Sequence, residues 1–332
     1  MVNKFAARRA GVLAARNAFP CGLVQASPLD ADRFEGPLDP SAEVPQPLSF
    51  RRQRTNSAPR TFFVLAKVAI NPISTRVIHP TAIIHPKARL DTSVRVGPYA
   101  VIDEAVEVGA GSVIGTYVYL TGITRIGSGN KFFAGCVIGE APQDLKYQGT
   151  ASRLNIGDNN IFREHVTVHR SSAEPEATTI GANNFLMAHC HVAHDCHVGD
   201  HVIMANGALL GGHVSVADRA LISGNCLVHQ FVRVGTLALM QGGSAISKDL
   251  PPYTVARGDN GICGLNTVGL RRAGLSSAER LELQQLYHAL FRGDLPLNRA
   301  IEAARAKFSS AVAKVLLDFL AASKRGVCAD VG

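Results

Sequence analysis

The chain of 332 residues carries a formal net charge of +8 and is 46% hydrophobic, so it can bury a large core and could hold two domains. It has no Trp and only 6% aromatic residues against 31 Gly, which indicates a core of small aliphatic side chains. Residues 1–70 hold 10 of the 34 Lys and Arg against 5 Asp and Glu, so the rest of the chain has a net charge of only +3 and a nucleic-acid-binding surface is not expected.

The N-terminal segment is basic. Residues 1–29 contain four Lys and Arg but no Asp or Glu, in an Ala-rich setting typical of an organelle transit peptide. Arg is more frequent there than Ser, which favours a mitochondrion over a plastid. The stretch from Pro28 to Thr61 is rich in Pro, Ser and Arg, which predicts an unstructured linker. We therefore expect residues 1–70 to be a transit peptide and disordered linker, with a basic disordered tail as the alternative.

A strict period of six residues follows. An aliphatic or Phe side chain stands at every sixth position from Ile78 to Ile138 and again from Ile180 to Ile246. Neither the helical period of 3.6 nor the strand period of 2 accounts for a strict six, so the pattern predicts a repeat architecture. No run of 18 apolar residues interrupts it, and no transmembrane helix is expected.

A small residue precedes most of these large anchors by two positions. One large and one small residue per face, followed by a polar turn, predict a triangular coil of 18 residues whose faces stack as parallel strands about 4.8 Å apart. We expect this β-helix to span residues 77–252. Four cysteines take the small interior position, which predicts buried structural thiols rather than nucleophiles. These are Cys136, Cys190, Cys196 and Cys226. The seven cysteines show no CxxC spacing, which favours reduced thiols.

The six-residue period is interrupted at residues 144–155 and 170–179. We expect Asp144–Ser152 and Ser171–Thr179 to be loops that leave the coil. Loops on a rigid scaffold are where proteins usually handle substrates.

The remainder of the chain, residues 253–327, is predicted to be a small α-helical domain. Asp249–Tyr253 contains two Pro and ends the repeats. Ser276 or Ser277 can cap a helix with Glu279 in its first turn. Its apolar residues are Leu281, Leu283, Leu286 and Leu290. Further helical patterns begin at Pro296 and cover Val312–Leu320, and such helices would cover the last edge of the coil.

Seven of the twelve His lie between residues 189 and 229. Asp195 and His213 are 18 residues apart, so they should stack on adjacent coils. Gly212 follows His194 by the same interval, which predicts open space and an exposed amide beside that imidazole. A base next to a carboxylate and a free N–H suits proton abstraction with a stabilised oxyanion, so His194 is the candidate base.

Two other interpretations of these histidines remain open. His189, His191 and His194 could be metal ligands, and a trimeric coil could share zinc between subunits. Alternatively, about half of the cluster decorates a solvated face.

Several sequence strings resemble one family. They are Gly139–Tyr147 (GEAPQDLKY), Val192–Cys196 (VAHDC), Gly212–Val216 (GHVSV), Val228–Phe231 (VHQF), Asp249–Tyr253 (DLPPY), Gly264–Asn266 (GLN) and Gly269–Arg272 (GLRR). In this order they resemble the acyl-carrier-protein–UDP-N-acetylglucosamine O-acyltransferases that open lipid A biosynthesis. The resemblance covers residues 77–327. It implies a mainly β protein, with a left-handed parallel β-helix of hexapeptide repeats and a small α-helical C-terminal domain, that forms a homotrimer with active sites between subunits.

The resemblance also implies roles for single residues. His194 corresponds to the general base for the sugar 3-hydroxyl, Asp195 to the carboxylate that orients it, and the Gly212 N–H to the group that binds the thioester oxyanion. Further positions match residues that contact the sugar, the diphosphate, the acyl chain or the nucleotide. They are Gln143, Asp144, Lys146, His191, His213, His229, Gln230, Gly242, Asn266 and Arg272.

No metal and no resident cofactor are implied, because the acyl chain arrives on the phosphopantetheine of acyl carrier protein. Arg271 and Arg272, with Lys324 and Arg325, could steer that acidic carrier. Val268 and Ala273 depart from the family pattern beside the nucleotide-contacting positions. The alternative functions are a zinc-dependent γ-type carbonic anhydrase and a non-catalytic scaffold.

Overall fold

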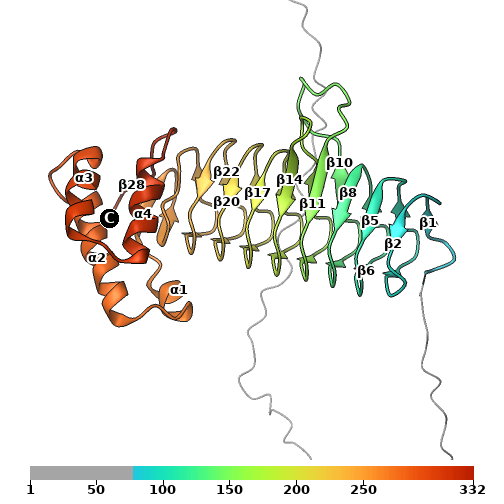
Figure 1. The fold of residues 1–332 in the computed structure, drawn as a ribbon, viewed down its shortest axis with the longest axis horizontal. Coiled ribbons are helices and arrows are strands. Elements are labelled where there is room, and N and C mark those ends of the chain that lie inside the picture. The colour runs from blue at the N-terminus through green and yellow to red at the C-terminus, as the bar shows by residue number, and fades with distance from the viewer. Residues whose placement is uncertain (1–77) are drawn as a thin grey trace, which may run out of the picture. The chain divides into compact units, whose positions relative to one another are not determined.

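The computed structural model describes residues 78–332, and the predicted transit peptide and linker at residues 1–70 lie outside this range (Figure 1). In the described range, 25 short strands wind into stacked coils, and three further strands and four helices follow. The predicted parallel β-helix of hexapeptide repeats with a C-terminal helical region is confirmed.

Each face of the coil forms one sheet. The nine-stranded sheet contains β1 (Ile83–Ile84), β4 (Val101–Ile102), β7 (Tyr119–Leu120), β10 (Val137–Glu140), β13 (Thr167–His169), β16 (His191–Val192), β19 (Leu209–Leu210), β22 (Leu227–Val228) and β25 (Ala245–Ile246). The eight-stranded sheet contains β2 (Arg89–Leu90), β5 (Val106–Val108), β8 (Ile123–Ile126), β11 (Arg153–Ile156), β14 (Ala177–Ile180), β17 (His197–Val198), β20 (Ser215–Val216) and β23 (Arg233–Val234). The eleven-stranded sheet contains β3 (Arg95–Val96), β6 (Val113–Ile114), β9 (Lys131–Phe132), β12 (Ile161–Phe162), β15 (Phe185–Leu186), β18 (Ile203–Met204), β21 (Leu221–Ile222), β24 (Leu239–Met240), β26 (Thr254–Arg257), β27 (Gly261–Leu265) and β28 (Ala329–Asp330).

The anchors of the six-residue period form the core. Val192 pairs with Leu210 and Leu210 with Val228, so partners 18 residues apart stack directly. Phe132 and Phe162 stack with ring centroids 4.7 Å apart. The four cysteines predicted for the small position are fully buried free thiols. An interior this narrow leaves room mainly for small side chains, which explains why the chain has no Trp and few aromatic residues.

Two insertions break the 18-residue spacing without breaking the sheets. Thirty residues separate Ile138 from its partner Val168, and 24 separate Ile156 from Ile180. The extra residues form loops at 141–152, beside β10 in Figure 1, and at 170–176. The second loop is shorter than predicted, because residues 177–179 already pair in β14.

Residues 254–265 are strands rather than the beginning of the predicted helical domain. β26 pairs in parallel with β24, and β27 pairs antiparallel with β26. The pair extends the eleven-stranded sheet past the Pro-containing turn and so covers its last edge. The helices begin with α1 (Thr267–Arg272).

The helical region contains α2 (Ser277–Phe291), α3 (Leu297–Lys307) and α4 (Ala311–Ala321). Ser276 caps α2 and forms a capping box with Glu279, as predicted. Leu283 is buried, but Leu281 is 55% exposed, because two residues along a helix turn a side chain to another face. Within residues 78–332 no helix combines the length and hydropathy that spanning a bilayer requires.

Candidate active site

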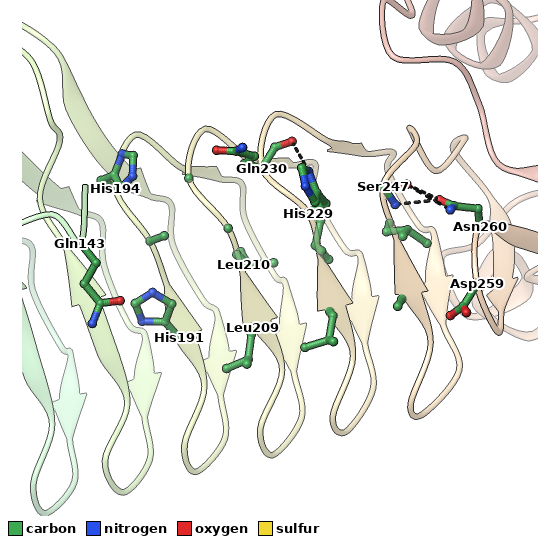
Figure 2. Close-up of a pocket in the computed structure, with 17 residues that line it drawn as sticks. Gln143, His191, His194, Leu209, Leu210, His229, Gln230, Ser247, Asp259 and Asn260 are labelled. Carbon is green, nitrogen blue, oxygen red and sulfur yellow. Dashed lines mark hydrogen bonds between the residues drawn. The ribbon is translucent and has the colours of Figure 1, made fainter. Parts of the chain in front are cut away.

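A pocket of about 730 Å³ lies along the nine-stranded sheet and the turns that follow its strands. Six of the predicted site residues line it: Gln143, His191, His194, Gly212, His229 and Gln230. Figure 2 shows Gln143, His191 and His194 at one end and Ser247, Asp259 and Asn260 at the other. Between them the wall is apolar, with Leu209, Leu210, Leu227 and Ile246. The pocket therefore has two polar ends joined by an apolar trough.

His194 and Asp195 form a hydrogen-bonded pair in the turn between β16 and β17. His194 Nδ1 lies 2.7 Å from Asp195 Oδ2, and both side chains are largely buried. When Nδ1 carries the proton that the carboxylate accepts, Nε2 keeps a lone pair for a proton from another molecule. This arrangement is that of a general base with an orienting carboxylate.

Gly212 lies against this imidazole on the next coil. A Cβ at this position would lie 2.7 Å from His194 Cε1 and 2.8 Å from Nε2. The predicted open space is therefore wrong in one respect, because the ring itself fills the volume that a side chain would take. Within the described residues the Gly212 N–H makes no hydrogen bond, which leaves it free to donate.

His213 stacks on Asp195 as the 18-residue spacing predicted. Its Nε2 lies 3.5 Å from Asp195 Oδ2, and its ring meets His194 edge to face with centroids 5.3 Å apart. On the other side it stacks on Phe231 at 4.5 Å. These contacts fix the ring next to the base.

Asp195 accepts hydrogen bonds from two serine hydroxyls that the sequence analysis did not predict. Ser171 Oγ–H donates to Oδ1, and Ser172 donates its N–H to Oδ1 at 3.0 Å and its Oγ–H to Oδ2 at 2.6 Å. Burial alone would raise the pKa of Asp195, but the hydrogen bonds from Ser171, Ser172 and His194 outweigh it and hold the pKa at about 2. The signal in the sequence was a pair of serines at the start of the second lapse.

His169 is a second missed residue, buried behind the pocket. Its ring meets that of His191 edge to face at 4.8 Å, and its Nδ1 has no hydrogen-bond partner in the described range. Burial, with help from neighbouring His191, His194 and Arg170, lowers the pKa of His169 to about 4. His191 in turn shares a 2.7 Å hydrogen bond with Thr167. His169 therefore stays neutral beside the pocket at physiological pH.

The first loop reaches the pocket through Gln143 alone. Asp144 Oδ1 accepts a hydrogen bond from the Lys146 N–H at 2.9 Å, which folds the loop back on itself. Arg170 ties the loop to the coil by donating to Gly139 O at 2.8 Å and to Tyr147 Oη at 3.2 Å. Asp144 and Lys146 stand next to the pocket but do not line it within one chain.

Three predicted residues lie on other parts of the molecule. Gly242 is in the turn after β24, at the corner between the eleven-stranded and nine-stranded sheets. Asn266 caps α1 through Gly269 and donates to Leu237 O at 2.9 Å, and exposed Arg272 ends that helix. One chain does not bring these residues together with His194.

Buried cysteines are not nucleophiles here. Burial raises the pKa of Cys196 to about 12 and that of Cys190 to about 11. Thiolates are therefore disfavoured beside the pocket.

The alternative interpretation of His189, His191 and His194 as ligands of one metal ion does not match their placement within one described chain. His189 stacks on His165 at a different corner of the coil, with ring centroids 5.3 Å apart. His194, Asp195 and His213 do hold three ligand-type atoms within 4.8 Å of one another. However, both Asp195 oxygens already accept hydrogen bonds, so the donor set is arranged for an imidazole rather than for an ion.

Stacked six-residue coils with a histidine–carboxylate pair facing a free backbone N–H define a hexapeptide-repeat transferase. Two family models match the chain: "Bacterial transferase hexapeptide (six repeats)" at residues 177–212 and "Udp N-acetylglucosamine O-acyltransferase; Domain 2" at residues 249–328.

Two curated relatives carry the same name. The chain is 44% identical to the acyl-[acyl-carrier-protein]–UDP-N-acetylglucosamine O-acyltransferase of Thermodesulfovibrio yellowstonii over 254 residues, which is 76% of this chain and 98% of the relative. It is also 44% identical to that of Halorhodospira halophila over 75% of this chain and 98% of the relative. The chain belongs to this acyltransferase family.

Solved structures agree. The UDP-N-acetylglucosamine acyltransferase of Francisella novicida superposes with a TM-score of 0.74 at 35% identity, over 76% of this chain and 94% of that one. The Arabidopsis enzyme gives 0.67 at 34% identity over 76% of this chain and 99% of that one.

Proposed function

We propose that this protein transfers an (R)-3-hydroxyacyl group from acyl carrier protein to the 3-hydroxyl of UDP-N-acetylglucosamine, the opening step of lipid A biosynthesis. One observation carries the assignment of roles: the His194–Asp195 pair faces the free Gly212 N–H at one polar end of a pocket, next to an apolar trough. The polar end with Gln143, His191 and His194 suits a sugar nucleotide, and the trough suits an acyl chain.

The proposed reaction needs no covalent enzyme intermediate. His194 Nε2 removes the proton of the sugar 3-hydroxyl, and the oxygen attacks the thioester carbonyl. The Gly212 N–H donates to the oxygen that becomes negative. As the C–O bond forms and the C–S bond breaks, the imidazolium returns the proton to the departing thiolate, which leaves a sugar ester, the carrier thiol and a neutral His194.

Asp195 supports each stage of this cycle. Its carboxylate holds the proton on Nδ1 and stabilises the imidazolium that forms. The remaining assignments follow the pocket: Gln143, His191 and Gln230 at the sugar and diphosphate, His229 beside them, and Asp144, Lys146 and His213 at the rim.

A homotrimer would complete the site. Gly242, Asn266 and Arg272 would come from a neighbouring subunit, where Gly242 bounds the acyl chain and the other two meet the nucleotide or the phosphopantetheine. The outer face of the nine-stranded sheet supports this arrangement, because Leu209 is 39% and Leu227 is 49% exposed in a single chain. Val268, 47% exposed, would give the nucleotide an apolar contact.

The carrier would dock on the basic C-terminal region. Arg325 lies 3.4 Å from His229 Nδ1 and donates to Ser247 O, so it stands at the mouth of the pocket. Arg271 and Arg272 add exposed positive charge on α1. An acidic carrier would be steered towards this surface.

The test is acyl transfer from 3-hydroxyacyl carrier protein to UDP-N-acetylglucosamine, measured for wild type and His194→Ala. Loss of a general base lowers the rate by about 10²-fold or more. His197→Ala is the matched control, because His197 is exposed on the eight-stranded sheet and hydrogen-bonds to Thr179. A His194→Ala rate within a few-fold of wild type removes His194 from the mechanism.

We also propose that residues 1–29 direct the protein to mitochondria. The basis is their basic, acid-free composition. An N-terminal fusion of residues 1–70 to a fluorescent protein should label mitochondria, and labelling of plastids or of the cytosol contradicts the proposal.

A further inference from the structure

We propose that Ser171 and Ser172 are positioning residues, which hold the Asp195 carboxylate in the one orientation that serves His194. This inference deepens the proposed function and rests on it, since it concerns how the base of that reaction is aligned. The two serines open the loop between β13 and β14, the second insertion in the coil. We call residues 170–172 the strap.

The strap saturates the carboxylate. Oδ1 accepts the Ser171 hydroxyl and the Ser172 N–H, while Oδ2 accepts the Ser172 hydroxyl and the His194 Nδ1–H. Ser171 is fully buried, and its Oγ also accepts the Ala173 N–H at 3.2 Å. Its hydroxyl proton has two acceptors within reach, Asp195 Oδ1 and Ala173 O at 3.0 Å, and the charged carboxylate is the stronger acceptor. Four donors on two oxygens leave the carboxyl group no other rotamer with equal hydrogen bonding.

The strap is itself fixed to the coil. Its Ser171 N–H donates to Arg153 O at 3.0 Å, and Arg170 donates to Gly139 O at 2.8 Å. From the opposite side, the Asp195 N–H donates to Thr178 Oγ1 at 2.8 Å. The hydroxyls are thus rigid with respect to the corner that carries His194 and Asp195.

Without the strap, Asp195 would have a competing partner. His213 Nε2 lies 3.5 Å from the same Oδ2 that binds His194. A carboxylate free to rotate could turn towards His213, and the His194 ring would then lose the partner that fixes its tautomer. Hydrogen bonds to charged groups contribute more than neutral ones, so two hydroxyls suffice to decide between these orientations.

The decisive experiment is a double-mutant cycle on the full-length enzyme. Ser171→Ala and Ser172→Ala should each lower kcat about tenfold, and together by up to about 100-fold, with the KM for the sugar nucleotide changed less than about twofold. In an Asp195→Ala background the same substitutions should cause no further loss, because they act through that carboxylate. A similar loss in that background, or a double variant within twofold of wild type, overturns the proposal.

A conservative variant and a spectroscopic signal separate positioning from folding. Ser172→Thr keeps the hydroxyl and should retain near wild-type kcat. In histidine labelled with ¹⁵N, the hydrogen-bonded His194 Nδ1–H resonance, assigned by its absence in His194→Gln, should shift or broaden in the double Ala variant and persist in Ser172→Thr. An unchanged resonance in the double variant contradicts the proposal. This readout does not depend on the substrate, so an inactive wild type would refute the proposed function while the strap is still tested.

The matched control is Ser93→Ala. Ser93 donates its N–H and hydroxyl to Asp91 Oδ1 at 2.8 and 2.5 Å on an exposed turn near the first coils. This substitution removes the same type of serine–aspartate hydrogen bond outside the pocket. It should leave kcat and the His194 resonance unchanged.

Discussion

Two stretches of one β-helix, residues 138–192 and residues 198–246, share a cross-section but contribute different things to the pocket. In the second stretch every stacked pair is 18 residues apart, as with Val198 and Val216, and the turns are short. It contributes the apolar wall, the free Gly212 N–H and the side chains of His229 and Gln230. The first stretch carries both insertions and contributes Gln143 and the strap. Regular coils therefore supply the wall, the backbone donor and several polar side chains, and the two insertions add Gln143 and the serines that hold Asp195.

The largest effect expected from this contrast is at the junction of the two stretches. Asp195→Asn removes the charge and one acceptor of the His194 pair, and kcat should fall by about 10³-fold or more, as for other His–Asp pairs. Asp218→Asn is the control, because Asp218 is exposed on a regular coil and, among the described residues, its carboxylate accepts only the Asp200 N–H, at 2.9 Å. Steady-state kinetics at saturating substrate measure both, and a loss below tenfold for Asp195→Asn would argue against the assigned role.

In the regular stretch, substitutions should affect stability rather than chemistry. Met204 is fully buried between Leu186 and Ile222 of the neighbouring coils. Met204→Ala should lower the free energy of unfolding by about 2–5 kcal/mol through lost burial and a cavity. Denaturant unfolding at fixed protein concentration measures this loss, and kcat below the unfolding temperature should stay near wild type. A large fall in kcat with unchanged stability would mean that the wall takes part in catalysis.

The interrupted stretch should make stability depend on pH through His169. Its pKa is lowered to about 4 in the folded state, against 6.5 ordinarily. Between pH 6.5 and pH 4 the unfolded chain binds a proton on His169, whereas the folded chain keeps this imidazole neutral. The free energy of unfolding therefore decreases progressively over this range, by up to about 3 kcal/mol.

His169→Phe should flatten this dependence between pH 6.5 and 4. Unfolding curves of wild type and variant across that range give the difference directly. Met204→Ala is the comparison, because it should lower the free energy of unfolding by the same amount at every pH. If the His169→Phe and wild-type curves run parallel, the buried imidazole is not the source.

The smallest expected effect is the difference in kcat between alanine substitutions at two glycines. In Gly212→Ala the new methyl would meet the His194 ring at 2.7 Å, so the imidazole must shift and kcat should fall about 10- to 100-fold. In Gly224→Ala on a regular coil, the nearest atom is Asn206 O at 3.4 Å, and kcat should be unchanged. Equal effects of the two substitutions would show that the contact with His194 is unimportant.

Most of the coil could be predicted because its signal is local and repeated. Each anchor, each small partner and each turn appears within six residues, and the interval of 18 correctly placed Asp195 beside His213. The same logic located both insertions. It missed the strands at 254–265, because a single pair at a sheet edge repeats nothing, and it assigned Leu281 to the wrong face of α2.

The hydrogen bonds of the strap could not be predicted in this way. Ser171 precedes Asp195 by 24 residues, the same interval that pairs Thr167 with His191 in the strands just before them. That interval replaces the usual 18 only because of the residues that the irregular second loop adds, and the path of this loop decides whether the serines reach Asp195. The burial of His169 was hidden for a similar reason, since it lies at the end of β13, where the rhythm lapses. Irregular segments place their side chains by tertiary contacts alone.

The pairing of Ile138 with Val168 across thirty residues has a wider consequence. Height along the coil axis is counted in turns of the coil, so the number of residues in a turn and the height of the next turn are separate variables. A loop can therefore be lengthened, shortened or replaced without displacing any group above or below it. Evolution, or a protein engineer, can alter what one coil of this molecule binds while every other coil keeps its position.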